Sequence, residues 1–114
     1  MCRYYFKKKL KLLKSKNFNY VFKKQNKVIY KEFIILSCIN NLFYPRLGLI
    51  VSKKNINKSH ERNRIKRLIR ETFRLSQYKL SHMDFVVIVK KNAKKNNNIT
   101  LINILKILWM EYYQ

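Results

Sequence analysis

Residues 62–71, with the sequence RNRIKRLIRE, interleave basic and branched apolar side chains in a pattern that can bind phosphate. At about 100° per residue, a helix would place the apolar side chains on one face and the basic ones beside it. A row of such cations neutralises successive phosphates, and a guanidinium can bind one phosphate through two hydrogen bonds. The residues predicted to contact a polyanion are Arg62, Asn63, Arg64, Lys66, Arg67 and Arg70, and those predicted to be buried are Ile65, Leu68, Ile69 and Phe73.

The charge of the whole chain also points to a polyanionic partner. The 114 residues include 27 Lys and Arg but only 5 Asp and Glu, which gives a formal net charge of +22. Self-repulsion of this size opposes a compact fold, and nucleic acid would relieve it. There are two alternatives to nucleic acid. The basic face could simply be solvated, or it could bind an anionic membrane surface. The longest apolar stretch is interrupted by polar residues and is too short to span a bilayer, so we expect no membrane partner.

Groups that could carry catalysis or bind a metal are sparse in the sequence. The acidic residues are Glu32, Glu61, Glu71, Asp84 and Glu111, and no two are close enough in sequence to suggest a two-metal hydrolytic site. His60 and His82 also lie apart, and Cys2 and Cys38 have no neighbours that would complete a metal set. We therefore expect no catalytic residue and no metal site in the polypeptide, and two reduced thiols in a cytoplasmic protein.

The length and composition predict one domain with a modest core. Hydrophobic residues make up 47% of the chain and aromatic residues 14%, which is enough for a core in a chain of this size. Residues 1–14 are predicted to be a flexible basic lead-in, and residues 15–114 to be the folded domain. Ser15 is a candidate N-cap for a short helix that carries Phe18 and Phe22 on one stripe.

Apolar runs in the sequence predict the strands. Residues 31–39, 46–52 and 85–89 are rich in β-branched and apolar residues and are predicted to be strands, with residues 28–30 a shorter strand before them. Gly48, the only glycine, lies inside one of these runs. Glycine weakens strand pairing, so a bulge or a close backbone approach would explain its presence there.

Two further segments are predicted to be helices. The basic run lies in a helix over residues 59–75, where Ser59 is a candidate N-cap and Glu61 stands in the favourable first turn. Residues 99–113 form a second helix, apolar over most of its circumference, which other elements must cover on more than one side. With the segment after Ser15, the order of elements is α-β-β-β-α-β-α. This order predicts an α+β fold with one sheet and helices packed against it.

The basic run and its flanking strands together resemble the protein subunit of bacterial ribonuclease P. Residues 48–55 (GLIVSKKN) precede the run and residues 84–89 (DFVVIV) follow it in the order and spacing of that family. The resemblance extends from about Phe18 to the C-terminus. It implies a sheet of about four strands with three helices and a left-handed crossover through the basic helix, an exception to the usual handedness.

The resemblance also implies a subunit of a ribonucleoprotein endoribonuclease. Such a protein binds a large catalytic RNA and the 5′ leader of precursor tRNA, and it promotes endonucleolytic removal of the leader, which matures the tRNA 5′ end. Hydrolysis would belong to the RNA and to Mg²⁺ ions held mainly by that RNA. The expected partners are the catalytic RNA, in a 1:1 complex with a monomeric protein, and precursor tRNA.

The site residues are divided between two surfaces by the same resemblance. The basic helix would dock the catalytic RNA. Phe18 and Phe22 would line a leader-binding cleft, since aromatic rings stack on unpaired bases, although core packing is the alternative for both. Ile34 and Leu36 would form the floor of the cleft, and Lys53, Lys54, Lys58 and Lys90 or Lys91 would line its rim. A structural RNA binder such as a small ribosomal protein fits the composition and charge equally well and is the alternative.

Overall fold

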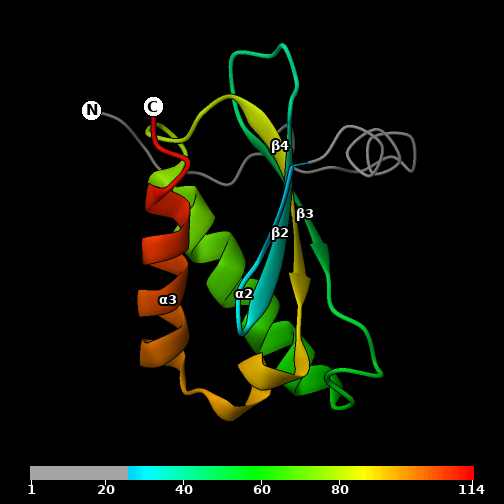
Figure 1. Ribbon diagram of the computed structural model, residues 1–114. Coiled ribbons are helices and arrows are strands. Elements are labelled where there is room, and N and C mark those ends of the chain that lie inside the picture. The colour runs from blue at the N-terminus through cyan, green and yellow to red at the C-terminus, as the bar shows by residue number, and fades with distance from the viewer. Residues whose placement is uncertain (1–25) are drawn as a thin grey trace.

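Within residues 26–114, a sheet of four strands carries two α-helices on one of its faces (Figure 1). The computed structural model describes residues 26–114, and the helix expected after Ser15 lies outside these residues. The strands are β1 (Asn26–Ile29), β2 (Phe33–Ile39), β3 (Arg46–Ile50) and β4 (Met83–Val89). The helices are α2 (Ser59–Ser76), the short 3₁₀ helix η2 (Lys91–Lys95) and α3 (Asn98–Met110). The described residues therefore confirm a mixed α+β fold with one four-stranded sheet.

The strands lie in the order β1-β2-β4-β3. β2 pairs antiparallel with both β1 and β4, whereas β3 and β4 pair in parallel. A parallel pair needs a connection that crosses back over the sheet, and α2 supplies it between β3 and β4. The basic run therefore lies in the crossover element, as the resemblance implied.

Gly48 lies in a regular part of β3. It pairs with Val86 within a parallel register that is unbroken from Arg46 to Ile50, and its φ angle is not positive. The bulge offered as one explanation of this glycine is therefore wrong, because the pairing register of β3 with β4 is continuous along the whole strand. The strand also ends at Ile50 and does not extend to residue 52 as predicted.

Alternate side chains of the sheet lie on opposite faces. Phe33 and Ile35 of β2 face α2 and α3 and belong to the main core. Leu36 and Cys38 face the other way and form a smaller buried cluster with Val86. The sheet thus separates two hydrophobic clusters, and only one of them includes residues of the described helices.

An aromatic group joins α2, α3 and the sheet. Trp109 of α3 packs edge-to-face against Phe73 of α2 and Phe85 of β4, with ring centroids 5.5 and 5.6 Å apart. The Trp109 Nε1–H donates to Thr72 Oγ1 at 3.0 Å, and this hydroxyl donates in turn to the Leu68 carbonyl. Such ring pairs, together with a satisfied indole, stabilise the contact between the helices. The core residues predicted in the basic helix are all buried, namely Ile65, Leu68, Ile69 and Phe73.

The helices differ from the prediction at their ends. α2 begins at Ser59, but its N-cap is Lys58 and no side chain caps it, so the predicted capping role of Ser59 is wrong. Lys58 is the last residue with extended backbone, which places Ser59 inside the first turn and not at the cap. Asn97 caps α3 by accepting a hydrogen bond from the Thr100 amide at 2.9 Å. α3 ends at Met110, short of the predicted limit at residue 113.

Candidate nucleic-acid interface

The exposed side of α2 carries an open hollow between basic side chains. The hollow has a volume of about 430 Å³ and is lined by His60, Asn63, Arg64, Arg67 and Arg70. These residues share a face because they follow one another at helical spacing, while Ile65 and Ile69 turn toward the core. Asn63, Arg67 and Arg70 are exposed. Within residues 26–114 neither Arg67 nor Arg70 forms an ion pair, so the hollow presents two uncompensated guanidinium groups.

Arg62 is held by the loop that precedes α2. Its Nη1 donates to the carbonyls of Ile56 and Asn57 at 3.0 and 2.9 Å. Since Ile56 is itself buried, the loop is fixed to the domain at two points. Arg62 therefore fastens the loop to the first turn of α2, and part of its hydrogen-bonding capacity is used within the protein. Lys66, on the same helix, is half-buried.

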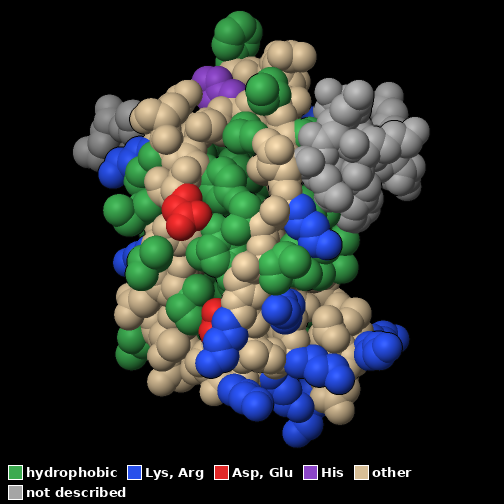
Figure 2. All heavy atoms as spheres, in the orientation of Figure 1, with side chains coloured by type: hydrophobic (Ala, Val, Ile, Leu, Met, Phe, Trp, Pro, Cys, Tyr) green, Lys and Arg blue, Asp and Glu red, His purple; other side chains and the backbone are tan. Residues whose placement is uncertain are grey.

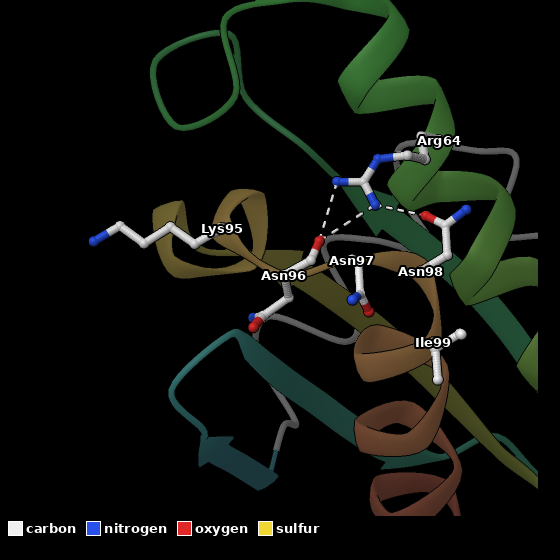
Figure 3. Close-up of a pocket in the computed structure, with 6 residues that line it drawn as sticks. All are labelled: Arg64, Lys95, Asn96, Asn97, Asn98 and Ile99. Atoms are coloured by element: carbon white, nitrogen blue, oxygen red, sulfur yellow. Dashed lines mark hydrogen bonds between the residues drawn. The ribbon is translucent and has the colours of Figure 1, made fainter.

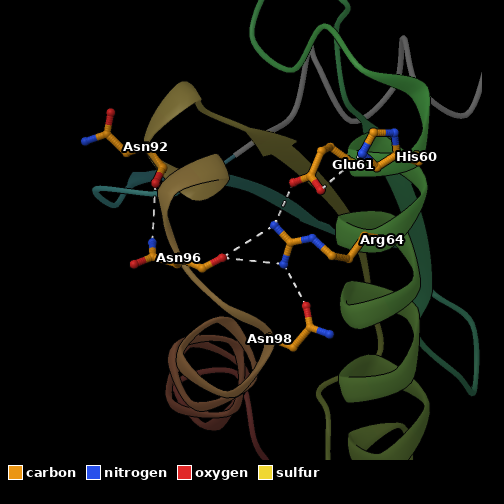
Figure 4. A network of polar contacts seen from close by, with 6 residues as sticks. All are labelled: His60, Glu61, Arg64, Asn92, Asn96 and Asn98. Carbon is orange, nitrogen blue, oxygen red and sulfur yellow. Dashed lines mark hydrogen bonds and ion pairs between the residues drawn. The ribbon is translucent and has the colours of Figure 1, made fainter.

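Arg64 joins α2 to the segment between η2 and α3 (Figure 4). Its Nη2 donates to Glu61 Oε2 at 3.0 Å, and its Nη1 donates to Asn98 Oδ1 at 2.6 Å. Both nitrogens also donate to the Asn96 carbonyl oxygen at 3.4 Å. The side chain is only 20% exposed. The hydrogen bond from Arg64, together with its charge, holds the pKa of Glu61 below its usual range.

A second hollow shares Arg64 with the first (Figure 3). Its volume is about 730 Å³, and it is lined by Arg64, Lys95, Asn96, Asn97, Asn98 and Ile99. Lys95 extends from the end of η2 away from Arg64 in this view. The Asn96 side chain donates to the Asn92 carbonyl at 3.3 Å, which closes the turn that leads into α3. No role was predicted for this segment, although its three successive asparagines after two lysines are a visible signal in the sequence.

The sheet face opposite α2 and α3 carries the residues predicted as the floor of a cleft. Ile34 is half-buried, and Leu36 is 3% exposed. They lie on one face because residues two apart in a strand point the same way. Burial raises the pKa of the Cys38 thiol in the same cluster, which makes this cysteine a poor nucleophile. The remaining predicted cleft residues, the aromatics at positions 18 and 22, lie outside the described residues.

Lysines predicted to line the cleft lie toward one end of the molecule. Lys53, Lys54 and Lys58 are exposed in the loop between β3 and α2. Figure 2 shows Lys and Arg side chains crowded at the lower end of the view, where Figure 1 places that loop and η2. Lys90 is half-buried, and its Nζ donates to the Tyr30 carbonyl at 3.0 Å. Part of its capacity is therefore used to hold the turn before β2.

Four acidic side chains of the described residues are bonded within the protein, namely those of Glu61, Glu71, Asp84 and Glu111. Asp84 accepts hydrogen bonds from Arg46 at 2.8 and 2.7 Å, and Glu71 accepts one from Arg74 at 2.7 Å. Among residues 26–114, no group of three or more His, Cys, Asp or Glu could hold a metal ion. In the same part of the chain, no helix has both the length and the apolar character needed to cross a membrane.

The sequence matches one protein family over nearly its whole length. The family model described as Ribonuclease P matches residues 6–113. The chain belongs to the ribonuclease P protein family. The Ribonuclease P protein component of Buchnera aphidicola subsp. Schizaphis graminum is 54% identical to it, over 98% of each chain. That of Baumannia cicadellinicola subsp. Homalodisca coagulata is 48% identical, over 100% of this chain and 99% of the relative.

The fold of this ribonuclease P protein also matches a solved structure. The RNase P protein of Staphylococcus aureus superposes with a TM-score of 0.85 at 29% identity, covering 92% of this chain and 98% of that one. The chain is therefore the protein subunit of ribonuclease P, an endoribonuclease of tRNA 5′ processing. Family membership decides against the small ribosomal protein that composition and charge alone allowed.

The fold brings some of the predicted site residues together and separates others. Asn63, Arg64, Arg67 and Arg70 line one hollow, but Arg64, like Arg62, is bonded to a neighbouring segment. The predicted floor residues lie on the sheet face away from α2, so the basic hollow and the predicted floor are on opposite sides of the sheet.

Proposed function

We propose that the chain binds the catalytic RNA of ribonuclease P through the exposed face of α2. The observation that carries this proposal is the hollow at which Asn63, Arg67 and Arg70 meet. Guanidinium groups with no carboxylate partner, fixed on a rigid helix, can bind phosphates bidentately, and phosphate contacts supply much of the affinity of protein–RNA complexes. Lys66 contributes from the edge of this face, where it is half-buried.

A second surface binds the 5′ leader of precursor tRNA. Ile34 and Leu36 support this assignment as neighbouring apolar side chains on the sheet face away from α2 and α3. Phe18 and Phe22 stack on unpaired leader bases, at roughly 1–3 kcal/mol per base. The leader phosphates are held by Lys53, Lys54, Lys58 and Lys90.

The polypeptide binds and orients RNA, and phosphodiester hydrolysis belongs to the RNA subunit. Mg²⁺ ions held mainly by that RNA supply the activated water and stabilise the leaving oxygen. The carboxylates of Glu61, Glu71 and Asp84 support this division, because each bonds an arginine of the chain. They therefore do not form the cluster of oxygen ligands that a magnesium ion requires.

The resemblance to the family also supports proposals for the stoichiometry, the cellular location, the domain limits and the handedness of the crossover. The protein acts as a monomer in a 1:1 complex with the RNA, in the cytoplasm. Residues 1–14 are a lead-in to a domain over residues 15–114, which has three helices in the order α-β-β-β-α-β-α. The crossover through α2 is left-handed, and the parallel pairing of β3 with β4 supports the presence of a crossover there.

Reconstitution with the catalytic RNA of the same organism tests the proposal. The protein alone should not cut precursor tRNA. Added to the RNA, it should lower the Mg²⁺ concentration needed for cleavage and tighten the binding of precursor over mature tRNA. If the preference for precursor tRNA were the same with and without the protein, the leader assignment would be wrong.

A further inference from the structure

We propose that Arg64 is a positioning residue that holds residues 95–98 against α2, so that the RNA-docking surface extends from α2 onto this segment. The inference rests on the proposed function, because it assumes that the hollow on α2 docks RNA. On the extended surface, Arg67, Arg70 and Lys95 contact phosphates of the RNA. Arg64 acts indirectly, through the segment that it holds.

The hydrogen bonds of Arg64 are directed at the protein. Its two terminal nitrogens donate to one carboxylate, one side-chain amide and one backbone carbonyl, on Glu61, Asn98 and Asn96. A guanidinium binds a phosphate bidentately through such a pair of nitrogens. Because both nitrogens already have partners and the side chain is only 20% exposed, a phosphate would have to displace existing bonds.

Arg64 also differs from the other cations of this surface in its ion pairing. Glu61 lies 3.0 Å from Arg64 and compensates its charge. Within residues 26–114, Arg67, Arg70 and Lys95 form no ion pair, and all three are exposed. Affinity for a polyanion and its salt dependence follow the number of phosphates neutralised. The uncompensated cations therefore account for the salt dependence, and Arg64 does not.

The segment that Arg64 holds has the character of an RNA-contacting surface. Its hollow combines a lysine with exposed asparagines, and amide groups hydrogen-bond phosphate, sugar or base edges. Asn97 is fixed as the N-cap of α3 and Asn96 is bonded to Asn92, so the turn has a defined shape. Arg64 lines both this hollow and the one on α2. The two hollows are thus parts of one surface that meet at Arg64.

The affinity of variants for the catalytic RNA, measured against salt concentration, tests the proposal. Asn98→Ala removes a partner of Arg64 without changing the charge, and it should weaken binding about fivefold, the effect of one hydrogen bond, with an unchanged salt slope. Arg64→Ala and Arg64→Lys should both weaken binding at least as much as Asn98→Ala, because each loses the bonds to Asn96 as well as the bond to Asn98. Arg67→Ala and Lys95→Ala should each lower the slope by about 0.7–0.9. Lys106→Ala, an exposed charge on α3, is the control and should leave the slope unchanged.

Opposite results would overturn the inference. If Arg64→Ala lowered the slope as much as Arg67→Ala, while Arg64→Lys and Asn98→Ala bound like the wild type, Arg64 would be a direct phosphate contact. An unchanged slope in Lys95→Ala would show that the surface stops at α2. Thermal unfolding identifies any variant that fails to fold, and the charge-neutral Asn98→Ala still decides the question. If the wild-type protein bound this RNA no better than an unrelated RNA, the proposed function itself would fail.

Discussion

Asn63 has an arginine on each side, and the fold uses both of them. Arg62 bonds the carbonyls of the loop before α2, and Arg64 bonds Asn98, which lies 34 positions further along the chain. A basic pattern in a sequence therefore overstates the number of side chains that are available to RNA. Exposure and partners distinguish Arg67 and Arg70, which are exposed and form no ion pair within residues 26–114.

Glu61 provides a direct measure of the Arg64 contact. We expect Arg64→Ala to raise the pKa of Glu61 toward its usual value, because the hydrogen bond from Arg64 is the main cause of its lowered pKa. The pair stabilises the fold above the pKa of an unfolded glutamate, about 4.3, and this stabilisation is lost as the pH falls through the lower folded pKa. An NMR titration of the Glu61 carboxyl carbon measures the shift. An identical pKa in the variant would mean that the contact is not formed in solution.

The ion pair between Arg46 and Asp84 joins neighbouring strands. Asp84 is 1% exposed, and it also accepts a hydrogen bond from Asn40 at 3.0 Å. Asp84→Ala would leave the Arg46 guanidinium and the Asn40 amide without this partner, so we expect a loss of about 2–3 kcal/mol in the free energy of unfolding. Urea denaturation measures it. Glu71→Ala, which removes an exposed ion pair, is the matched control and should cost less than about 1 kcal/mol.

At the scale of elements, α2 carries both the proposed RNA-binding face and a face that packs in the core. One face packs on α3 and the sheet, and the other carries the basic hollow. Because a helix is rigid, the position of the basic face depends on the packing of the buried one. The aromatic contacts of Phe73 with Trp109 and Phe85 therefore set the position of the candidate RNA-binding residues.

Truncation of the buried face should lower stability strongly. Phe73→Ala would open a cavity beside Trp109 and Phe85, and we expect a cost of about 3–5 kcal/mol. Leu75→Ala is the control, because this side chain on the same helix is 49% exposed and should change stability by less than about 1 kcal/mol. Chemical denaturation followed by tryptophan fluorescence or circular dichroism measures both. Equal losses in the two variants would contradict the assigned packing.

At the scale of the whole molecule, the sheet separates the two surfaces for which different RNA partners are proposed. The basic hollow lies on α2, which covers one face, and Ile34 and Leu36, the predicted floor of the cleft, lie on the other face. The free-energy effects of mutations at distant, independent sites are additive. The two surfaces can therefore be altered separately.

Charge removal at the two surfaces should produce different defects. A variant with Lys53, Lys54 and Lys58 changed to Ala should lose preference for precursor over mature tRNA but still bind the catalytic RNA. Arg67→Ala with Arg70→Ala should weaken assembly with the catalytic RNA and lower its salt slope by about 1.4–1.8. Filter binding of each RNA at several salt concentrations measures both effects. Loss of the same activity in both variants would show that the two surfaces are not distinct.

Local patterns were sufficient to find most elements and the division of α2 into two faces. Apolar runs identified β2, β3 and β4, and helical spacing identified the buried residues Ile65, Leu68, Ile69 and Phe73, because these features depend on neighbours in the chain. The N-cap of α2 was assigned wrongly, since it depends on where the backbone turns into the helix. The partners of Arg62 and Arg64 required the tertiary structure. Their guanidinium groups bond atoms that folding alone brings near, and no periodicity in the sequence records such contacts.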